Sequence, residues 1–158
     1  MKSTIVPLIL SLSLAAGAAL AAGDPGASSA APPKDPVLEK VAEATRVQNW
    51  PAAQAVLRDA VAREPRNADY HNLYAYTVRK GANPDMGLVF KEYNAALAID
   101  PKHKQAHEYL GEAYLMVGNV AKAKEHLKIL DGLCTFGCAE YSELKKSIAD
   151  YEAKQAAR

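Results

Sequence analysis

A phrase that occurs twice in the chain constrains the fold more than any other feature of the sequence. Ala-Val-Ala-Arg-Glu-Pro ends at Pro65, and Ala-Leu-Ala-Ile-Asp-Pro ends at Pro101, 36 residues later. Turn-like phrases begin at Asn49, Asp85 and Asn119, at spacings of 36 and 34 residues. A period near 34 residues is typical of stacked helix–turn–helix units. The sequence therefore predicts an all-α chain of tandem helical repeats.

Apolar residues at helical spacing and start signals define the expected helices. Asn49 followed by Pro51 is a start signal, because Asn caps a helix and Pro fits its first turn. A last amphipathic stretch around Leu144 and Ile148 predicts a C-terminal helix that shields the apolar end of the last unit. We expect the six earlier helices near residues 37–47, 51–63, 68–80, 85–99, 104–117 and 120–131.

The third unit resembles a tetratricopeptide repeat (TPR). Leu110-Gly111 followed by Tyr114 is similar to the first-helix signature of that family, and Gly118-Asn119 is similar to its turn. The resemblance implies a right-handed α-α superhelix of about three TPR helix pairs plus a C-terminal capping helix. It also implies that Gly111 is a point of close helix contact, so that Gly111→Leu should destabilise the fold.

The resemblance and the composition together divide the chain into segments. Three repeats are expected at about 37–67, 68–103 and 104–133, followed by a Cys-containing turn and the capping helix at 134–158. The segment from Leu133 to Leu144 also resembles small exported bacterial TPR proteins with a Cys-x-x-x-Cys before the last helix. That resemblance implies no particular activity for these residues.

The N-terminus has the pattern of a secretory signal peptide. A basic start is followed by apolar and small residues, and Ala19-Leu20-Ala21 fits the small-x-small cleavage rule. We expect a signal peptide at 1–21, a flexible Ala/Pro/Gly-rich linker at 22–36 and a periplasmic or secreted mature protein that begins near Ala22. An uncleaved N-terminal membrane anchor is the alternative, although the apolar stretch is short for a span.

The charge balance excludes some partner classes. Removing residues 1–21 leaves 18 basic and 18 acidic residues, so the mature chain is formally neutral. Binding to nucleic acid or to an anionic membrane surface requires a basic field. We therefore expect no nucleic-acid partner, and the lack of a second long apolar stretch predicts no integral membrane association.

The two cysteines, Cys134 and Cys138, are the sharpest chemical feature. In an oxidising compartment such a pair favours a structural disulfide, with Gly137 bending the chain and Phe136 tucked under the loop. Two alternatives stay open. A redox dithiol usually has two intervening residues, whereas three separate this pair. A copper or zinc site would need a third ligand, and His126 lies too far along a continuous helix to supply one.

The histidines and the remaining motifs give no catalytic pattern. His103 and His107 have a spacing that could share an ion, but Pro101 places His103 before its helix. His71 and His107 occupy corresponding positions in successive repeats, which indicates packing between units. The sequence has no Gly-x-Ser-x-Gly, no His-Glu-x-x-His and no Gly-rich phosphate loop. We therefore expect no enzyme activity, no bound metal and no cofactor.

The function that remains is the binding of a protein or peptide by a scaffold of the bacterial cell envelope, with a thiol-redox or metal-handling role as the alternative. In TPR arrays the first helix of each unit lines a concave groove. Helical spacing places Tyr76 about 200° from the core residue Tyr74, which indicates an outward direction. The alternative is that Arg79 and Lys80 only pair with the next unit. By resemblance, the groove residues are Asn72, Tyr76, Arg79, Lys80, Glu108, Glu112, Leu115 and Met116.

Overall fold

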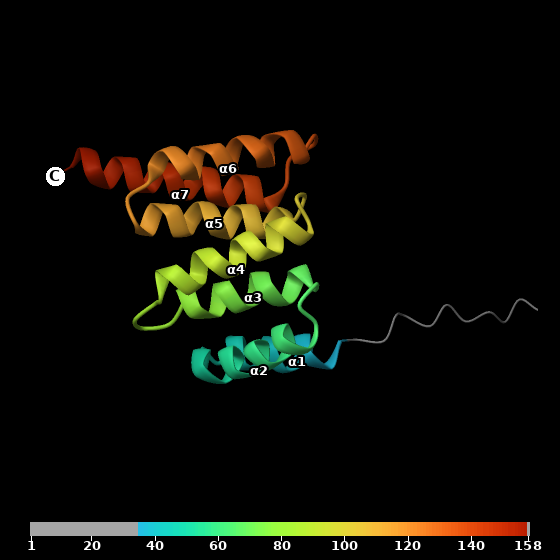
Figure 1. Cartoon of the computed structure of the whole chain (residues 1–158). Coiled ribbons are helices and arrows are strands. Elements are labelled where there is room, and N and C mark those ends of the chain that lie inside the picture. Colours follow the sequence, from blue (N-terminus) through green and yellow to red (C-terminus); the bar gives the residue numbers. More distant parts are fainter. Residues whose placement is uncertain (1–34, 158) are drawn as a thin grey trace, which may run out of the picture. The chain divides into compact units, whose positions relative to one another are not determined.

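The computed structural model describes residues 35–157, which form seven helices and contain no strand. The helix pairs stack in chain order as successive layers, and the last helix lies against both helices of the third pair (Figure 1). Three helix pairs are followed by a helix that packs on α5 and α6, which confirms the predicted all-α superhelix with a capping helix. The helices are α1 (Pro36–Arg46), α2 (Trp50–Arg63), α3 (Ala68–Arg79), α4 (Met86–Ile99), α5 (Lys104–Met116), α6 (Val120–Leu133) and α7 (Ala139–Ala156).

Polar side chains set where the helices begin. The cap of each of the first six helices accepts a hydrogen bond from a backbone N–H of the first turn, which satisfies a group that the helix itself leaves unpaired. These caps are Asp35, Asn49, Asn67, Asp85, His103 and Asn119. Asp35 and Pro36 fall within the predicted linker, so the folded part begins slightly earlier than expected. The predicted signal peptide and the linker up to residue 34 lie outside the described residues.

The turns inside the first and third pairs share one backbone geometry. Gly118 has φ +78° and Gln48 has φ +54°, and the amide of each donates to the carbonyl three residues earlier at 3.0 Å. This left-handed conformation suits glycine, and it costs a residue with a side chain roughly 1–2 kcal/mol. The first pair therefore makes the repeat turn without the glycine that marks it in the third.

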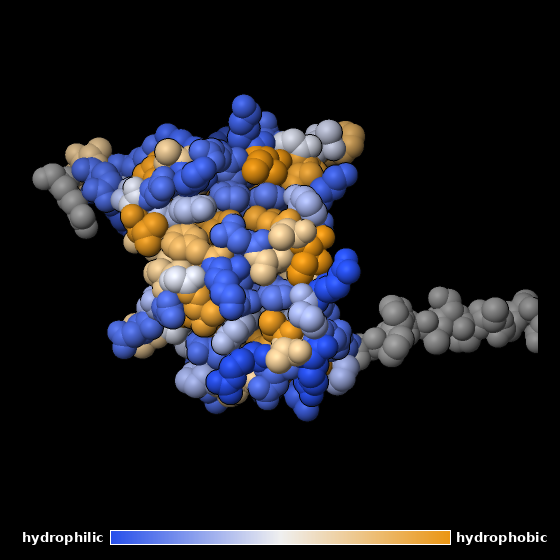
Figure 2. All heavy atoms as spheres, in the orientation of Figure 1, coloured by the Kyte–Doolittle hydropathy of each residue, from blue (hydrophilic) through white to orange (hydrophobic). Residues whose placement is uncertain are grey.

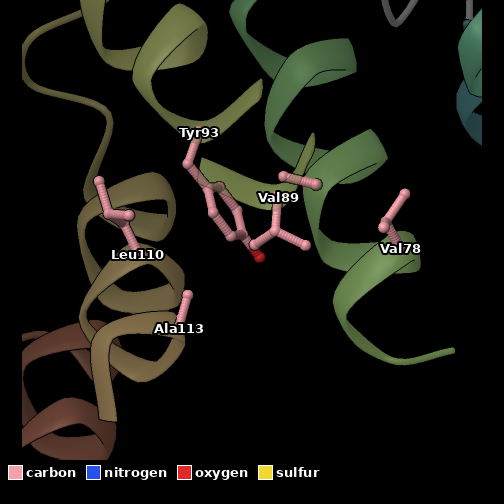
Figure 3. Packing of buried hydrophobic residues seen from close by; sticks show 6 residues of the cluster. Val78, Val89, Tyr93, Leu110 and Ala113 are labelled. Atoms are coloured by element: carbon pink, nitrogen blue, oxygen red, sulfur yellow. The ribbon is translucent and has the colours of Figure 1, made fainter. Parts of the chain in front are cut away.

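The core lies between neighbouring layers. Val89 and Tyr93 of α4 are fully buried, and they face Val78 of α3 and Leu110 and Ala113 of α5 (Figure 3). Each pair of helices thus covers the apolar side of the next, which is how repeat proteins gain stability. Val89, at a position where the family usually has a small residue, fits without exposure.

The two ends of the stack are closed unequally. At the N-terminal end, α1 buries one residue, Val41, and the Tyr70 hydroxyl donates to the Asp35 carboxylate at 2.7 Å. At the C-terminal end, α7 is longer and buries Leu144 and Ile148. No helix among the described residues is long and apolar enough to cross a membrane.

A disulfide between Cys134 and Cys138 closes the loop that joins α6 to α7. Gly137 turns the chain there with φ +83°, as expected for a glycine in this role. Cys134 packs against the cluster under α7, which directs the middle of the loop outward. The Phe136 side chain is therefore fully exposed, and the prediction that it tucks under the loop is wrong.

Candidate functional site

Three aromatic side chains from successive layers form a row. Tyr76 of α3 stacks on Tyr109 of α5, with ring centroids 4.8 Å apart and planes 29° apart. Trp50, at the start of α2, meets Tyr76 edge to face at 6.1 Å. All three residues are half-buried, so part of each remains open to solvent. We call Trp50, Tyr76 and Tyr109 the aromatic row.

A mainly apolar depression adjoins the Trp50 end of this row. It lies where the start of α2 meets the end of α3 and the loop before α4. Its lining includes Trp50, Pro51, Gln54, Tyr74, Val78, Gly81 and Leu88. Figure 2 shows that hydrophobic residues gather over the middle layers of the stack on the face in view, whereas hydrophilic residues dominate the end layers. An apolar side chain of a partner could enter such a depression.

Arg79 links the aromatic row to the polar part of the site. Its Nη2 lies 2.8 Å from Glu112 Oε2, and its Nε donates to the Tyr93 hydroxyl at 3.2 Å. The guanidinium also lies 5.8 Å and 5.4 Å from the ring centroids of Tyr76 and Tyr109, within the range of a cation–π contact. The arginine is buried, and these contacts fix its position between α3 and α5.

Acidic side chains occupy the side of the site that faces α7. The Ser147 hydroxyl donates to Glu112 Oε1 at 3.2 Å, so Glu112 joins α3, α5 and α7. Glu108, one turn earlier on α5, is only 9% exposed. Burial, then the nearby Glu112, Glu140 and Glu143, raises the pKa of Glu108 to about 7. Its carboxyl therefore changes charge near neutral pH.

The predicted groove residues divide into accessible and buried ones. Lys80 and Met116 are exposed, at the ends of α3 and α5. Asn72 is fully buried, Leu115 is 8% exposed, and Arg79 and Glu108 are each 9% exposed. The prediction that Asn72 and Leu115 line an open groove is therefore corrected, and Arg79 and Glu108 expose only a small part of their surfaces. Asn72 donates to Gln105 across the seam between α3 and α5, and Leu115 packs against the cluster under α7.

The alternative prediction, that Arg79 and Lys80 pair with residues of the next repeat, is confirmed for one of the two. Arg79 does pair with Glu112 of the next unit, whereas the described contacts include no such pair for Lys80. Tyr76 lies beside Arg79 and is half-buried, as is Tyr74, the residue that the helical angle assigns to the core. Arg79 therefore supports the fold and the position of the aromatic row together.

The histidines form packing contacts between the turns and the second helices. His71 Nε2 donates to the Pro65 carbonyl at 3.1 Å, and His107 Nε2 donates to the Pro101 carbonyl at 3.0 Å. The other ring nitrogen, Nδ1, meets Glu92 in one repeat and His126 in the next. The predicted equivalence of His71 and His107 is confirmed. In residues 35–157 no three metal-ligating side chains are grouped to hold an ion.

Trp50 and Tyr109 are the site residues that the sequence analysis missed. Trp50 lies between the helix cap Asn49 and Pro51, so the sequence pattern assigns it to a helix start and not to a contact with Tyr76. Tyr109 occupies the position that Leu73 has in the preceding repeat, so the repeat alignment alone assigns it to packing. One signal for Trp50 was available in the sequence. It is the single tryptophan of the chain, and it stands beside a turn at the position that Met86 has in the next repeat, 36 residues later.

Comparisons with known proteins agree with this architecture. A family model described as tetratricopeptide repeat matches residues 92–125, from α4 into α6. The crystal structure of PcrH in complex with the chaperone binding region of PopD is similar with a TM-score of 0.60. The likeness covers 77% of this chain and 90% of that one at 15% sequence identity, so it concerns the fold. None of the curated proteins matches the sequence. The chain is a helical-repeat protein, and its residues 92–125 match the tetratricopeptide repeat family.

Proposed function

We propose that the chain is a non-catalytic scaffold that binds a segment of another protein across the aromatic row. The observation that carries this proposal is the row itself, in which Trp50, Tyr76 and Tyr109 remain partly open beside an apolar depression. Trp and Tyr most often carry the binding energy of an interface. The complex of PcrH with a region of another protein supports a segment of polypeptide as the occupant.

The packing of the row also suits it to binding. Each ring contacts its neighbour, and the Arg79 guanidinium lies near two of the rings. The side chains are therefore held before a partner arrives, and less conformational entropy is lost on association. The disulfide, at the joint between α6 and α7, supports a structural role for the two cysteines in such a scaffold.

A photo-crosslinking amino acid at position 76 should capture a partner in the native cell, whereas the same group at Ile129, exposed on α6, should not. Tyr76→Ala should then weaken binding of the captured protein by about tenfold or more, as expected for a central aromatic contact. Phe136→Ala is the matched control, because it removes an exposed aromatic side chain outside the row. If Phe136→Ala weakens binding and Tyr76→Ala does not, the assignment to the aromatic row is wrong.

We further propose that the protein acts after export, in the periplasm or outside the cell. The pattern of residues 1–21 and the disulfide, which persists in oxidising compartments, support this location. Intact-mass measurement of protein from the exported fraction should show a chain that begins at or near Ala22. A species that retains residues 1–21 would instead support the N-terminal anchor.

A further inference from the structure

One largely buried glutamate of the site forms no ion pair or hydrogen bond of its own within residues 35–157. By helical spacing Glu108 projects from the same face of α5 as Glu112, one turn earlier. It is 9% exposed, and among the described residues it forms no hydrogen bond or ion pair. An acidic side chain that is buried without a partner is unfavourable in the isolated protein, so a group that compensates it can contribute to binding.

The charged groups that face Glu108 compensate it only weakly, because Arg79 is the one cation among them and its effect on the pKa of Glu108 is smaller than that of burial and of the three neighbouring acids. On α3, Arg79 is already bonded to Glu112 and to the Tyr93 hydroxyl. On α7, Glu140 and Glu143 add negative charge, as Glu112 does on α5. The only cation among these groups is thus committed elsewhere, and the surroundings of Glu108 are net acidic.

A second acceptor on the same seam also lacks a donor. Asn72 Nδ2 donates to Gln105 Oε1 at 2.8 Å, which leaves the buried Asn72 Oδ1 without a partner in the described structure. Gln105 lies one turn before Glu108 on the same face of α5. The seam between α3 and α5 therefore offers acceptors in excess of donors. Lysine and arginine side chains carry only donors, so they have the complementary chemistry.

A shallow depression adjoins the Gln105 end of this seam. Glu140 belongs to its lining and also acts on Glu108. The two exposed lysines of the lining are Lys102, in the turn before α5, and Lys104, the first residue of α5. The lining residues are Asp69, Asp100, Lys102, His103, Lys104, Gln105 and Glu140.

We propose that Glu108 binds the side chain of a lysine or arginine in the segment that occupies the aromatic row. The partner is then a segment with an apolar or aromatic residue for the row and a positive charge for the acidic side. This inference rests on the proposed function and names the chemical class of its ligand. When the cation binds, Glu108 is held in its ionised form, so binding near neutral pH releases a proton.

A random 12-residue peptide library, selected at pH 8 on the mature protein, tests this specificity. The unmodified protein should enrich peptides in which a lysine or arginine lies at a fixed spacing from an apolar residue. Glu108→Gln should keep the apolar preference and lose the basic one. Asp131→Asn is the matched control, because it removes an exposed acid on α6 outside the site and should keep both preferences.

A synthetic peptide from that selection then tests the charge. Its affinity for the unmodified protein should rise up to about tenfold between pH 6 and pH 8, as a carboxyl with a pKa of about 7 ionises. Glu108→Gln should weaken binding of this peptide by about 10- to 100-fold at pH 8 and remove the rise with pH. A peptide with glutamine in place of the basic residue should show no rise with either protein.

The outcomes separate the two proposals. Two results would overturn the role of Glu108 and leave the scaffold function in place. The unmodified protein could select apolar peptides that lack a basic residue, or Glu108→Gln could select basic residues as strongly as the unmodified protein does. No enriched peptide of any kind would overturn both. A melting temperature of Glu108→Gln at or above that of the unmodified protein at pH 8 shows that the variant is folded, because it removes an unpaired buried charge.

Discussion

Replacing Gly111 with leucine is expected to lower the free energy of unfolding by about 3 kcal/mol and the melting temperature by about 10 °C. A Cβ atom at this position would lie 2.6 Å from Leu144 Cδ2 and 2.7 Å from its Cδ1. Leu144 is fully buried, so its side chain has little room to move away. The larger side chain must therefore push α5 and α7 apart. Thermal and denaturant melts followed by circular dichroism measure the effect.

Gly132→Leu is the matched control for this substitution. Gly132 also lies within a helix, α6, but apart from its chain neighbours and the nearby backbone of that helix no heavy atom lies within 4 Å of the position its Cβ would take. The same change should there leave stability unchanged or raise it, because leucine favours a helix more than glycine does. Equal melting temperatures for the two variants would contradict the close contact at Gly111. The predicted close helix contact at Gly111 is thus with the capping helix.

Arg79→Ala is expected to destabilise the fold by about 3 kcal/mol or more. The arginine is buried, and its removal leaves Glu112 without its cation and the buried Tyr93 hydroxyl without the Arg79 donor. It also removes the guanidinium from beside the rings of Tyr76 and Tyr109. A melt of Arg79→Ala beside Lys80→Ala measures the effect, since Lys80 is the adjacent cation and is exposed.

This second result bears on how the groove can be tested. From helical angles alone, the double variant of Tyr76 and Arg79 is expected to bind less while keeping its stability. The contacts of Arg79 correct that expectation, because its loss would weaken binding through the fold. Tyr76→Ala alone is the informative variant. If Arg79→Ala melts as Lys80→Ala does, the pairing with Glu112 contributes nothing measurable.

The architecture was predictable because its signals are local. Repeat spacing, caps and helical periodicity depend on residues near one another in the chain. They place the first six helices within one residue of their observed bounds, apart from the Leu133 end of α6. The left-handed backbone conformation of Gln48 could not be predicted from such signals, because the first repeat has no glycine at this turn position.

The site was harder to predict because it depends on which side chains meet between layers. Asn72 and Leu115 have the polarity and position of groove residues in the sequence, yet packing from the neighbouring helix covers them. Trp50 and Tyr76 are distant in the chain and belong to different repeats, so no periodic pattern joins them. The unpaired state of Glu108 likewise depends on where Arg79 directs its donors, which only the three-dimensional arrangement determines.

The unequal closure of the two ends has a consequence for local unfolding. In a stack whose layers contact mainly their neighbours, an end layer can detach at a small fraction of the cost of global unfolding. The α1 helix buries only Val41, so this layer should open often, and its amide hydrogens should exchange early. The α7 helix is tied by a disulfide and by Leu144 and Ile148, so its amides should be protected longer. The protein therefore frays from its N-terminal side while Glu108 and Tyr109 stay on the slowly exchanging part.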